Sequence, residues 1–197
     1  MPRNTVAAKS ISSLSDQNNS HQAYAFSTAL GWMILAWREE KLTRLSFGFP
    51  SLPSAVREFT KLLTDAPVQV VPETELPRWL RSLSKQLARL AEGQAIDFSA
   101  VPLELGKQTS FQRQVLEHCR RIPAGCTKSY AELAALAGSP RAARAVGNVM
   151  RSNRFPLLIP CHRVIGSNGQ LCGFTSPQGL TMKERLLQLE RAMQLNA

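Results

Sequence analysis

The sequence has no apolar run long enough to cross a bilayer. Its longest run, around Trp32 to Trp37, is far shorter than the roughly 20 residues that a transmembrane helix needs. The N-terminus also lacks the basic and then apolar layout of a signal peptide. We therefore expect an intracellular protein without a membrane partner, cytoplasmic or, in a eukaryote, nuclear. With 44% hydrophobic residues among 197, the chain can bury a core and fold as a soluble globular protein.

Cysteine is scarce, and its spacing excludes the simplest zinc motifs. The chain has four cysteines, at positions 119, 126, 161 and 172, and no pair of them has the C-x-x-C spacing of a zinc knuckle. Because no export signal is present, these residues are expected to be thiols rather than disulfides. We expect no structural metal.

Acidic residues are also few, with 14 Asp and Glu against 24 Lys and Arg. Residues 1–100 hold 11 basic and 9 acidic residues, whereas residues 101–197 hold 13 and 5. The second half is therefore the better candidate for contact with a polyanion. Taken alone, the net charge is better explained by a positive surface that aids solubility than by DNA binding. It becomes informative only together with a DNA-binding motif.

The first part of the chain predicts a tail followed by a small α/β domain. Residues 1–20 are rich in Ser, Asn and Gln and are expected to form a flexible tail, and the domain is expected over residues 21–104. Within it, FSTALGWMILAW (26–37) and LTRLSFGF (42–49) predict two strands joined by the charged turn REEK. The first of these strands is apolar enough to be buried on both faces.

The remaining patterns of this domain are a helix over 53–64, a short strand at 68–71 and a leucine stripe from 76 to 90. An irregular stretch near residues 97–106 marks the predicted domain boundary. The C-terminal domain, residues 105–197, is expected to be mainly helical, and its first helix begins at Thr109 or Ser110.

Two short helices joined by a tight turn follow, as in a helix-turn-helix. Ser129 and Glu132 form a capping box for YAELAALAG, which Gly138 ends. Ser139 as N-cap and Pro140 as first residue then predict a second helix, RAARAVGNVMRSN. Ordinary helical hairpins outnumber DNA-binding ones, so this pattern alone does not establish DNA binding.

The second helix combines small residues with arginines. One face has only small side chains: Ala142, Ala143, Ala145 and Gly147. Such a face can approach the wall of a DNA groove closely, and Arg141, Arg144 and Arg151 supply positive charge beside it. Close packing against another helix explains the alanines equally well, but it does not explain the arginines among them.

The segment LLIPCHRVIGSNGQLCGF (157–174) contains a candidate nucleophile, Cys161. A thiol reacts as its thiolate, and the surroundings supplied by His162, Arg163 and a helix start are expected to lower its pKa. Ser-Asn-Gly at 167–169 predicts the turn of a hairpin between the arms VI and QL. Cys172 falls on the second arm and is given no catalytic role.

IPCHRV (159–164) is the active-site motif of the O6-alkylguanine-DNA alkyltransferases, or methylated-DNA–protein-cysteine methyltransferases, and the chain closely resembles that family. Further family motifs occur in the same order: FQ (111–112), IPAG-x-T-x-SY (122–130), AARAVG (142–147), Asn153 and K-x-x-LL-x-x-E (183–190). The specific match covers about residues 110–190. The resemblance implies a ribonuclease H-like α/β N-terminal domain and a C-terminal domain with a winged-helix-like helix-turn-helix.

The resemblance also implies a single-turnover reaction without a cofactor or metal. Cys161 attacks the alkyl carbon on O6 of guanine, or less efficiently on O4 of thymine, and keeps the group as a thioether. In the family's relay a water links the cysteine to His162, which Glu190 orients and charges. Asn153 is implied to hydrogen-bond near the nucleophile. Two structural interpretations compete with these roles. Glu190 could simply lie on the solvent-exposed face of a helix, and Asn153 could be the C-cap of the preceding helix.

The implied partner is alkylated double-stranded DNA, bound by a monomer from the minor groove with the damaged base flipped out. Arg144 matches the arginine that fills the vacated place in the base stack, and Tyr130 matches a tyrosine that helps rotate the nucleotide. Other implied DNA contacts are Thr127, Ser129, Ala143, Ala145 and Arg151. The implied base pocket consists of Met150, Val164, Phe174, Thr175 and Ser176.

The loop at 174–179 departs from the family pattern, because it has an apparent lengthening by two residues and Pro177 in place of a Ser- and Gly-rich stretch. Tolerance of bulky alkyl groups is therefore left open.

Three other function classes also stay open: a non-catalytic damage-recognition protein, a transcription regulator and a thiol hydrolase. Retention of Cys161 argues against the first, and the lack of an added regulatory domain argues against the second. Turnover distinguishes the third, because a hydrolase recovers its free thiol.

Overall fold

The computed structural model describes residues 21–62 and 68–195, so the tail predicted over residues 1–20 lies outside the described residues. The first half contains a four-stranded sheet with strand order β3-β2-β1-β4. Its strands are β1 (His21–Thr28), β2 (Gly31–Arg38), β3 (Lys41–Phe49) and β4 (Val68–Val70). Neighbouring strands run antiparallel except β1 and β4, which are parallel, so the sheet is mixed.

The single strand predicted over 26–37 is wrong, because a turn divides this segment into β1 and β2. The Thr28 hydroxyl donates to the Gly31 carbonyl at 2.7 Å and accepts from the Leu30 amide at 3.1 Å. Gly31 has a φ of 93°, and a Cβ there would lie 2.7 Å from the carbonyl oxygen of Phe49, so only glycine fits. The two central residues of the turn, Ala29 and Leu30, are apolar, and Leu30 is buried, so the centre of the turn lacks the polar residues that usually mark one.

Helices cover both faces of the sheet, namely α1 (Leu52–Leu62) and α2 (Arg78–Ala91). Ile34 and Ala36 of β2 pack in a cluster with residues of α1, whereas Met33 and Leu35 belong to the cluster that contains the leucines of α2. Because successive side chains of a strand point to opposite faces, β2 is buried on both, as its apolar sequence predicts. The 3-10 helix η2 (Glu73–Glu75) precedes α2.

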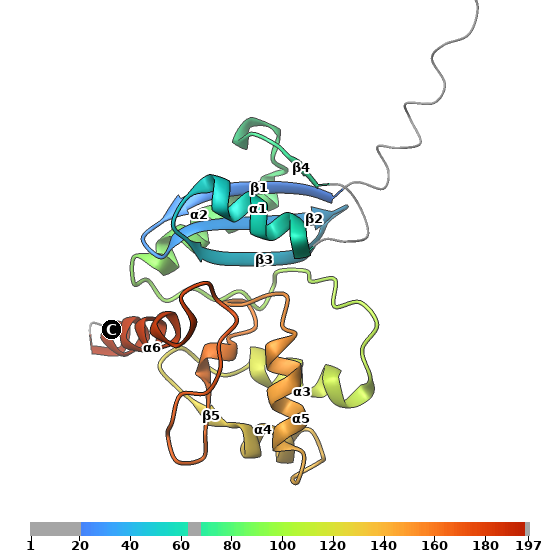
Figure 1. The fold of residues 1–197 in the computed structure, drawn as a ribbon, viewed down its shortest axis with the longest axis vertical. Coiled ribbons are helices and arrows are strands. Elements are labelled where there is room, and N and C mark those ends of the chain that lie inside the picture. Colours follow the sequence, from blue (N-terminus) through green and yellow to red (C-terminus); the bar gives the residue numbers. More distant parts are fainter. Residues whose placement is uncertain (1–20, 63–67, 196–197) are drawn as a thin grey trace, which may run out of the picture.

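The second half is mainly helical and lies on the β3 side of the sheet (Figure 1). Its elements are α3 (Ser110–Arg120), β5 (Lys128–Ser129), α4 (Tyr130–Leu136), α5 (Ala143–Arg151), the 3-10 helix η3 (Cys161–Arg163), β6 (Val164–Ile165) and α6 (Gly179–Leu195). Both side chains of the predicted capping box, Ser129 and Glu132, make its reciprocal hydrogen bonds. Across residues 21–62 and 68–195, no helix is both long and apolar enough to span a membrane.

The second helix of the predicted helix-turn-helix begins later than its sequence indicates. Its N-cap is Ala142, not Ser139, and Pro140 lies outside it. The amide of Ala142 instead donates to the Ser139 carbonyl at 2.9 Å, which closes a turn over residues 139–142. Ser and Pro also favour the first two positions of a β-turn, and at this site the turn wins.

The hairpin predicted around residues 167–169 forms only its turn. Gly166 donates to the Gln170 carbonyl at 2.8 Å, and Gly169 has a φ of 79°. However, β6 pairs in parallel with β5 rather than with the residues that follow the turn. Cys172 is therefore exposed in a segment without strand structure.

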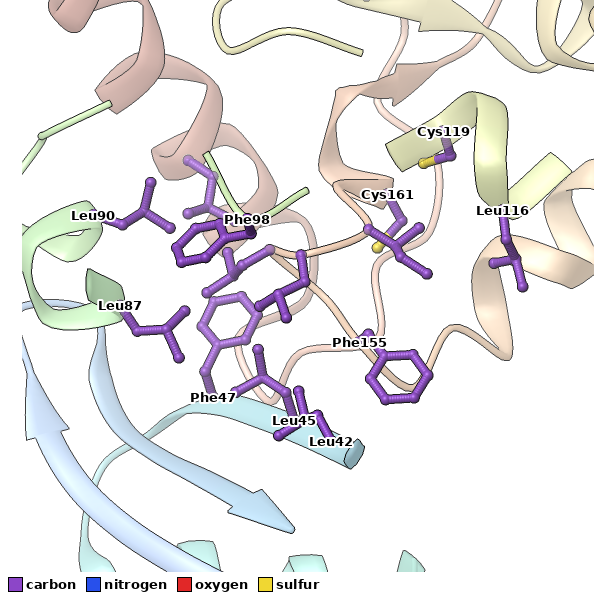
Figure 2. Packing of buried hydrophobic residues seen from close by; sticks show 14 of the residues in the cluster. Leu42, Leu45, Phe47, Leu87, Leu90, Phe98, Leu116, Cys119, Phe155 and Cys161 are labelled. Atoms are coloured by element: carbon purple, nitrogen blue, oxygen red, sulfur yellow. The ribbon is translucent and has the colours of Figure 1, made fainter. Parts of the chain in front are cut away.

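One hydrophobic core extends through both halves (Figure 2). Phe47 of β3 and Leu87 of α2 belong to the same buried cluster as Phe155 and Cys161. Backbone hydrogen bonds hold two segments at the edge of β3. In the segment that leads into the second half, Leu42 donates to Pro102 at 3.0 Å and Glu104 donates to Leu42 at 2.8 Å, and Leu45 donates to Arg154 of the second half at 2.9 Å. Strand β3 is thus where the sheet meets the segment that leads to the candidate nucleophile.

Candidate active site

Cys161 begins η3 and is only 8% exposed. Its side chain lies on the wall of a cavity of about 990 Å³, which residues of β3, the end of α5 and the loop before α6 also line. The thiol is therefore shielded from bulk water and accessible from one side.

Burial raises the pKa of the Cys161 thiol, although a hydrogen bond with Asn153, the ammonium of Lys183 and nearby backbone amides act in the opposite direction. The backbone amides of Cys161 and His162 at the start of η3 act in the expected direction, but the expected net lowering of this pKa is wrong, because removal of the thiolate from water outweighs these favourable neighbours. In the resting protein the thiol is protonated, and it needs a base in order to react.

His162 and Glu190 form a buried pair beside the nucleophile. The ring Nε2 lies 2.8 Å from Glu190 Oε1, and each residue is 2% exposed. Arg163 donates from Nη2 to the same oxygen at 2.7 Å, and the amide of Gly125 donates to Oε2 at 3.1 Å. Burial alone would raise the pKa of Glu190, but its interactions with His162 and Arg163 lower it to about 2. Glu190 is therefore ionised.

The charge of Glu190 determines where the proton of His162 resides. Burial lowers the pKa of His162 against the influence of Glu190, so the ring is neutral and has one N–H. An ionised carboxylate can only accept, so that proton is on Nε2. Nδ1 then bears the lone pair, and it is buried without a hydrogen bond to any of the described residues. The ring is therefore prepared to accept a proton at Nδ1.

Lys183 is a component of the site that sequence reasoning used only as a family motif. Its side chain is 0% exposed, and Nζ donates to the carbonyls of Val164 at 2.6 Å and Cys172 at 3.0 Å. It also lies 5.9 Å from the centre of the Tyr130 ring. Burial lowers its pKa, with the neighbouring thiols acting the other way. The sequence does contain an indication of this role, because Lys183 precedes Glu190 by seven residues and therefore lies on the same face of α6.

Asn153 spans the bend between α5 and the nucleophile. Its Nδ2 donates to the Ile159 carbonyl at 2.8 Å, and its Oδ1 accepts from the Phe155 amide at 3.0 Å. Between these contacts Leu157 has a φ of 72°, a backbone conformation that leucine disfavours. The Asn153 side chain therefore stabilises the bend that brings Cys161 to the cavity.

The helix-turn-helix surface has a hollow of its own, with a volume of about 720 Å³. It brings together predicted DNA contacts and base-pocket residues: Tyr130, Ala143, Arg144, Met150, Arg151, Phe174 and Thr175. Met150, Phe174 and Thr175 also line the Cys161 cavity, so the two spaces share a wall. A Cβ on Gly147 would lie 4.0 Å from the Tyr130 ring, an ordinary van der Waals contact, so the packing of α5 against Tyr130 does not by itself require glycine at this position.

The other predicted contacts lie outside this hollow. Thr127 is exposed before β5, Ser129 caps α4, and Ala145 is exposed on α5. Val164 is buried, and its carbonyl accepts a hydrogen bond from Lys183. Ser176 lies beside Gly48 of β3. Sequence reasoning assigned no role to Arg163 as a partner of Glu190, because the pairing depends on a helix 27 positions away.

Comparison with known proteins gives consistent matches. Residues 110–192 match the family model described as 6-O-methylguanine DNA methyltransferase, DNA binding domain. The constitutive methylated-DNA–protein-cysteine methyltransferase of Bacillus subtilis is 38% identical over 164 residues, which cover 83% of this chain and 92% of the relative. The corresponding protein of Kluyveromyces lactis is 40% identical over 115 residues, covering 58% of this chain and 60% of that relative.

Solved structures show the same fold. The Mycobacterium tuberculosis OGT in complex with DNA superimposes with a TM-score of 0.69 at 30% identity, covering 87% of this chain and 94% of that one. The O6-methylguanine-DNA methyltransferase of Pyrococcus kodakaraensis KOD1 shares the fold with a TM-score of 0.66 at 20% identity, covering 85% of this chain. Because the match to the Bacillus subtilis protein spans nearly that whole relative, this chain belongs to the methylated-DNA–protein-cysteine methyltransferase family.

Proposed function

We propose that the protein repairs double-stranded DNA by transferring an alkyl group, principally methyl, from O6 of guanine to the sulfur of its own Cys161. O4-alkylthymine is the poorer substrate. The observation that supports this most strongly is a buried thiol on a cavity wall beside a neutral histidine, whose Nε2 is held by an ionised glutamate. The names of the relatives point to the same reaction.

In the proposed reaction, Sγ of Cys161 attacks the alkyl carbon while the bond between that carbon and O6 breaks. The electron pair of the broken bond stays on O6, which becomes the carbonyl of guanine as the ring nitrogen takes up a proton from water. The thiol proton passes through a water to Nδ1 of His162, and Glu190, 2.8 Å from the ring, stabilises the imidazolium. The thioether has no route back to the thiol, so each protein acts once.

DNA is proposed to bind along α4 and α5, with the damaged base flipped out from the minor groove. Arg144, exposed on α5, fills the vacated place in the stack, and Tyr130 helps to rotate the nucleotide. The shared wall of Met150, Phe174 and Thr175 supports a path from the helix surface to Cys161. Val164 and Ser176 complete the base pocket, and Thr127, Ser129, Ala143, Ala145 and Arg151 contact the DNA backbone.

A monomer is sufficient for this scheme. The finer fold assignments, a ribonuclease H-like first half and a winged-helix-like second half, belong to the same proposal.

Intact-protein mass spectrometry tests the proposal directly. The protein is mixed with a duplex that holds one O6-methylguanine, and a gain of one methyl in exchange for one hydrogen is expected, saturating at one per molecule. Cys161→Ala should show no gain. Cys172→Ala is the matched control, since it removes an exposed thiol and should behave as wild type.

Two other results would replace the proposal. Tight binding of the damaged duplex without a mass gain would indicate a non-catalytic damage-recognition protein. Release of product with recovery of the free thiol would indicate a thiol hydrolase.

A further inference from the structure

The loop over residues 174–179, which connects the nucleophile segment to α6, lies against strand β3 of the other half. The rings of Phe174 and Phe47 meet edge to face, with centres 6.3 Å apart and planes at 68°. Gln178 Nε2 donates to the Gly48 carbonyl at 3.0 Å. The loop therefore has an apolar and a polar attachment to adjacent residues of one strand.

Gly48 allows this close approach. Its φ is 87°, and a Cβ there would lie 2.9 Å from Ser176 Oγ and 3.2 Å from Met182 Cε. The positive φ favours glycine, and any larger residue would force the Ser176 and Met182 side chains to shift. Strand β3 is thus shaped to receive the loop.

The opposite side of the loop contacts the helix-turn-helix. Thr175 Oγ1 donates to the Arg151 carbonyl at the end of α5, at 3.3 Å. Phe47, Phe174 and Thr175 all line the cavity on whose wall Cys161 lies. The attachment to β3 therefore determines the position of the part of the cavity wall that Phe174 and Thr175 form.

We propose that β3 selects the alkyl group by positioning this loop, so that the sheet half takes part in substrate recognition. Phe47 and Gly48 hold the loop that carries Phe174 and Thr175 on the wall of the Cys161 cavity, and the position of the loop sets how much room a bulky alkyl group has beside the nucleophile. Gln178 is a positioning residue, since it touches the loop's support rather than the substrate. This inference rests on the proposed alkyl transfer and assigns its specificity.

Two substitutions at one exposed position test the inference. Gln178→Glu keeps the shape but replaces the donor with a carboxylate that repels the Gly48 carbonyl, and Gln178→Met removes the hydrogen bond without adding charge. Gln188→Glu is the matched control, because it makes the same charge change on the exposed face of α6, away from β3. Single-turnover alkylation is followed against the concentration of two duplexes, which hold O6-methylguanine or O6-benzylguanine.

Both Gln178 variants should lose preference for methyl over benzyl by about three- to tenfold, the range expected for one hydrogen bond. The loss should appear as half-saturation at a lower concentration of the benzyl duplex, because the displaced loop leaves more room beside Cys161, and the maximal rate should change by less than about twofold, since the nucleophile is untouched. Gln188→Glu should keep the wild-type preference.

A second variant, Phe47→Leu, trims the apolar attachment and should shift the preference in the same direction. An unchanged methyl-to-benzyl ratio in the Gln178 variants, with wild type active, would overturn the inference. So would a uniform slowing with both duplexes together with a lower melting temperature, because that result marks a purely structural contact. A wild-type protein that transfers neither group would instead overturn the proposed function.

Discussion

Lys183 and Glu190 reach the nucleophile segment from one face of α6, and neither is exposed. Buried charges require partners. Lys183 finds them in two backbone carbonyls, and Glu190 in His162, Arg163 and the Gly125 amide. The last helix therefore fixes both the base and the backbone that follows Cys161.

Stability should fall in acid because of this network. Burial lowers the pKa of His162 below 6.5, and the partners of Glu190 lower its pKa from 4.5 to about 2 despite its burial. Between the folded and unfolded values the unfolded chain binds more protons, so acid favours unfolding. The free energy of unfolding, from guanidinium titrations, should decrease as the pH drops below 6.5 through His162 and further from 4.5 to about 2 through Glu190.

Glu190→Gln should remove the more acidic part of this dependence and also lower stability at neutral pH, since it leaves Arg163 without its carboxylate partner. Glu184→Gln, an exposed change on the same helix, is the control. Equal stability of the wild type at pH 7 and pH 4 would contradict the assignment.

Single residues could be predicted from sequence where a contiguous motif contains them. Cys161 and His162 lie in IPCHRV, whereas Asn153 was assigned through the family resemblance alone, and Cys161 and Asn153 both line the cavity. The raised pKa of the thiol and the pairing of Arg163 with Glu190 could not be predicted, because both depend on burial and on distant elements.

Helices α4 and α5 present an exposed arginine between small residues, and the hollow beside Arg144 also contains Tyr130. If Arg144 replaces the flipped base, its role is confined to duplex substrates. Arg144→Ala should therefore react normally with free O6-benzylguanine and lose at least about tenfold in the repair rate of duplex O6-methylguanine, since unstacking a base costs a few kcal/mol.

Arg141→Ala removes the same charge from the turn before α5 and serves as the control. Single-turnover rates on both substrates decide the question. Equal loss on free base and duplex would assign Arg144 to the chemistry or to folding instead of base extrusion.

Elements with strong local signals could be predicted closely. The capping box at Ser129 and Glu132 marks the start of α4, and the continuous apolar run of β2 marks a strand buried on both faces. The turn before Gly31 could not be predicted, because the buried Leu30 continues the apolar pattern of a strand. The start of α5 could not be predicted either, because Ser139-Pro140 suits a turn as well as a helix start.

At the scale of the whole molecule, Cys161 belongs to a core shared by both halves (Figure 2). Cores packed to high density tolerate added atoms poorly, and each misfit costs about 1–3 kcal/mol. The alkylated protein should therefore melt about 2 to 10 °C below the free protein in a thermal scan.

The control is the Cys161→Ala variant incubated with the same damaged duplex. It shows how far DNA that remains in the sample changes the melting temperature. A melting temperature as high as that of unreacted protein would show that the cavity accommodates the group without strain. The sharing of one core was not predictable, because patterns along the chain indicate which residues are buried but not which halves bury them together.

The edge of β3 has a further consequence for behaviour at high concentration. An unpaired strand edge is a template on which other chains can add strands, the first step toward aggregates. Backbone groups around Pro102, Glu104 and Arg154 occupy the edge of β3, and the strand at the opposite edge, β4, has only 3 residues. The same contacts at Leu42 and Leu45 thus leave less of the edge of β3 available for intermolecular strand pairing, which lowers the tendency of this edge to start aggregation.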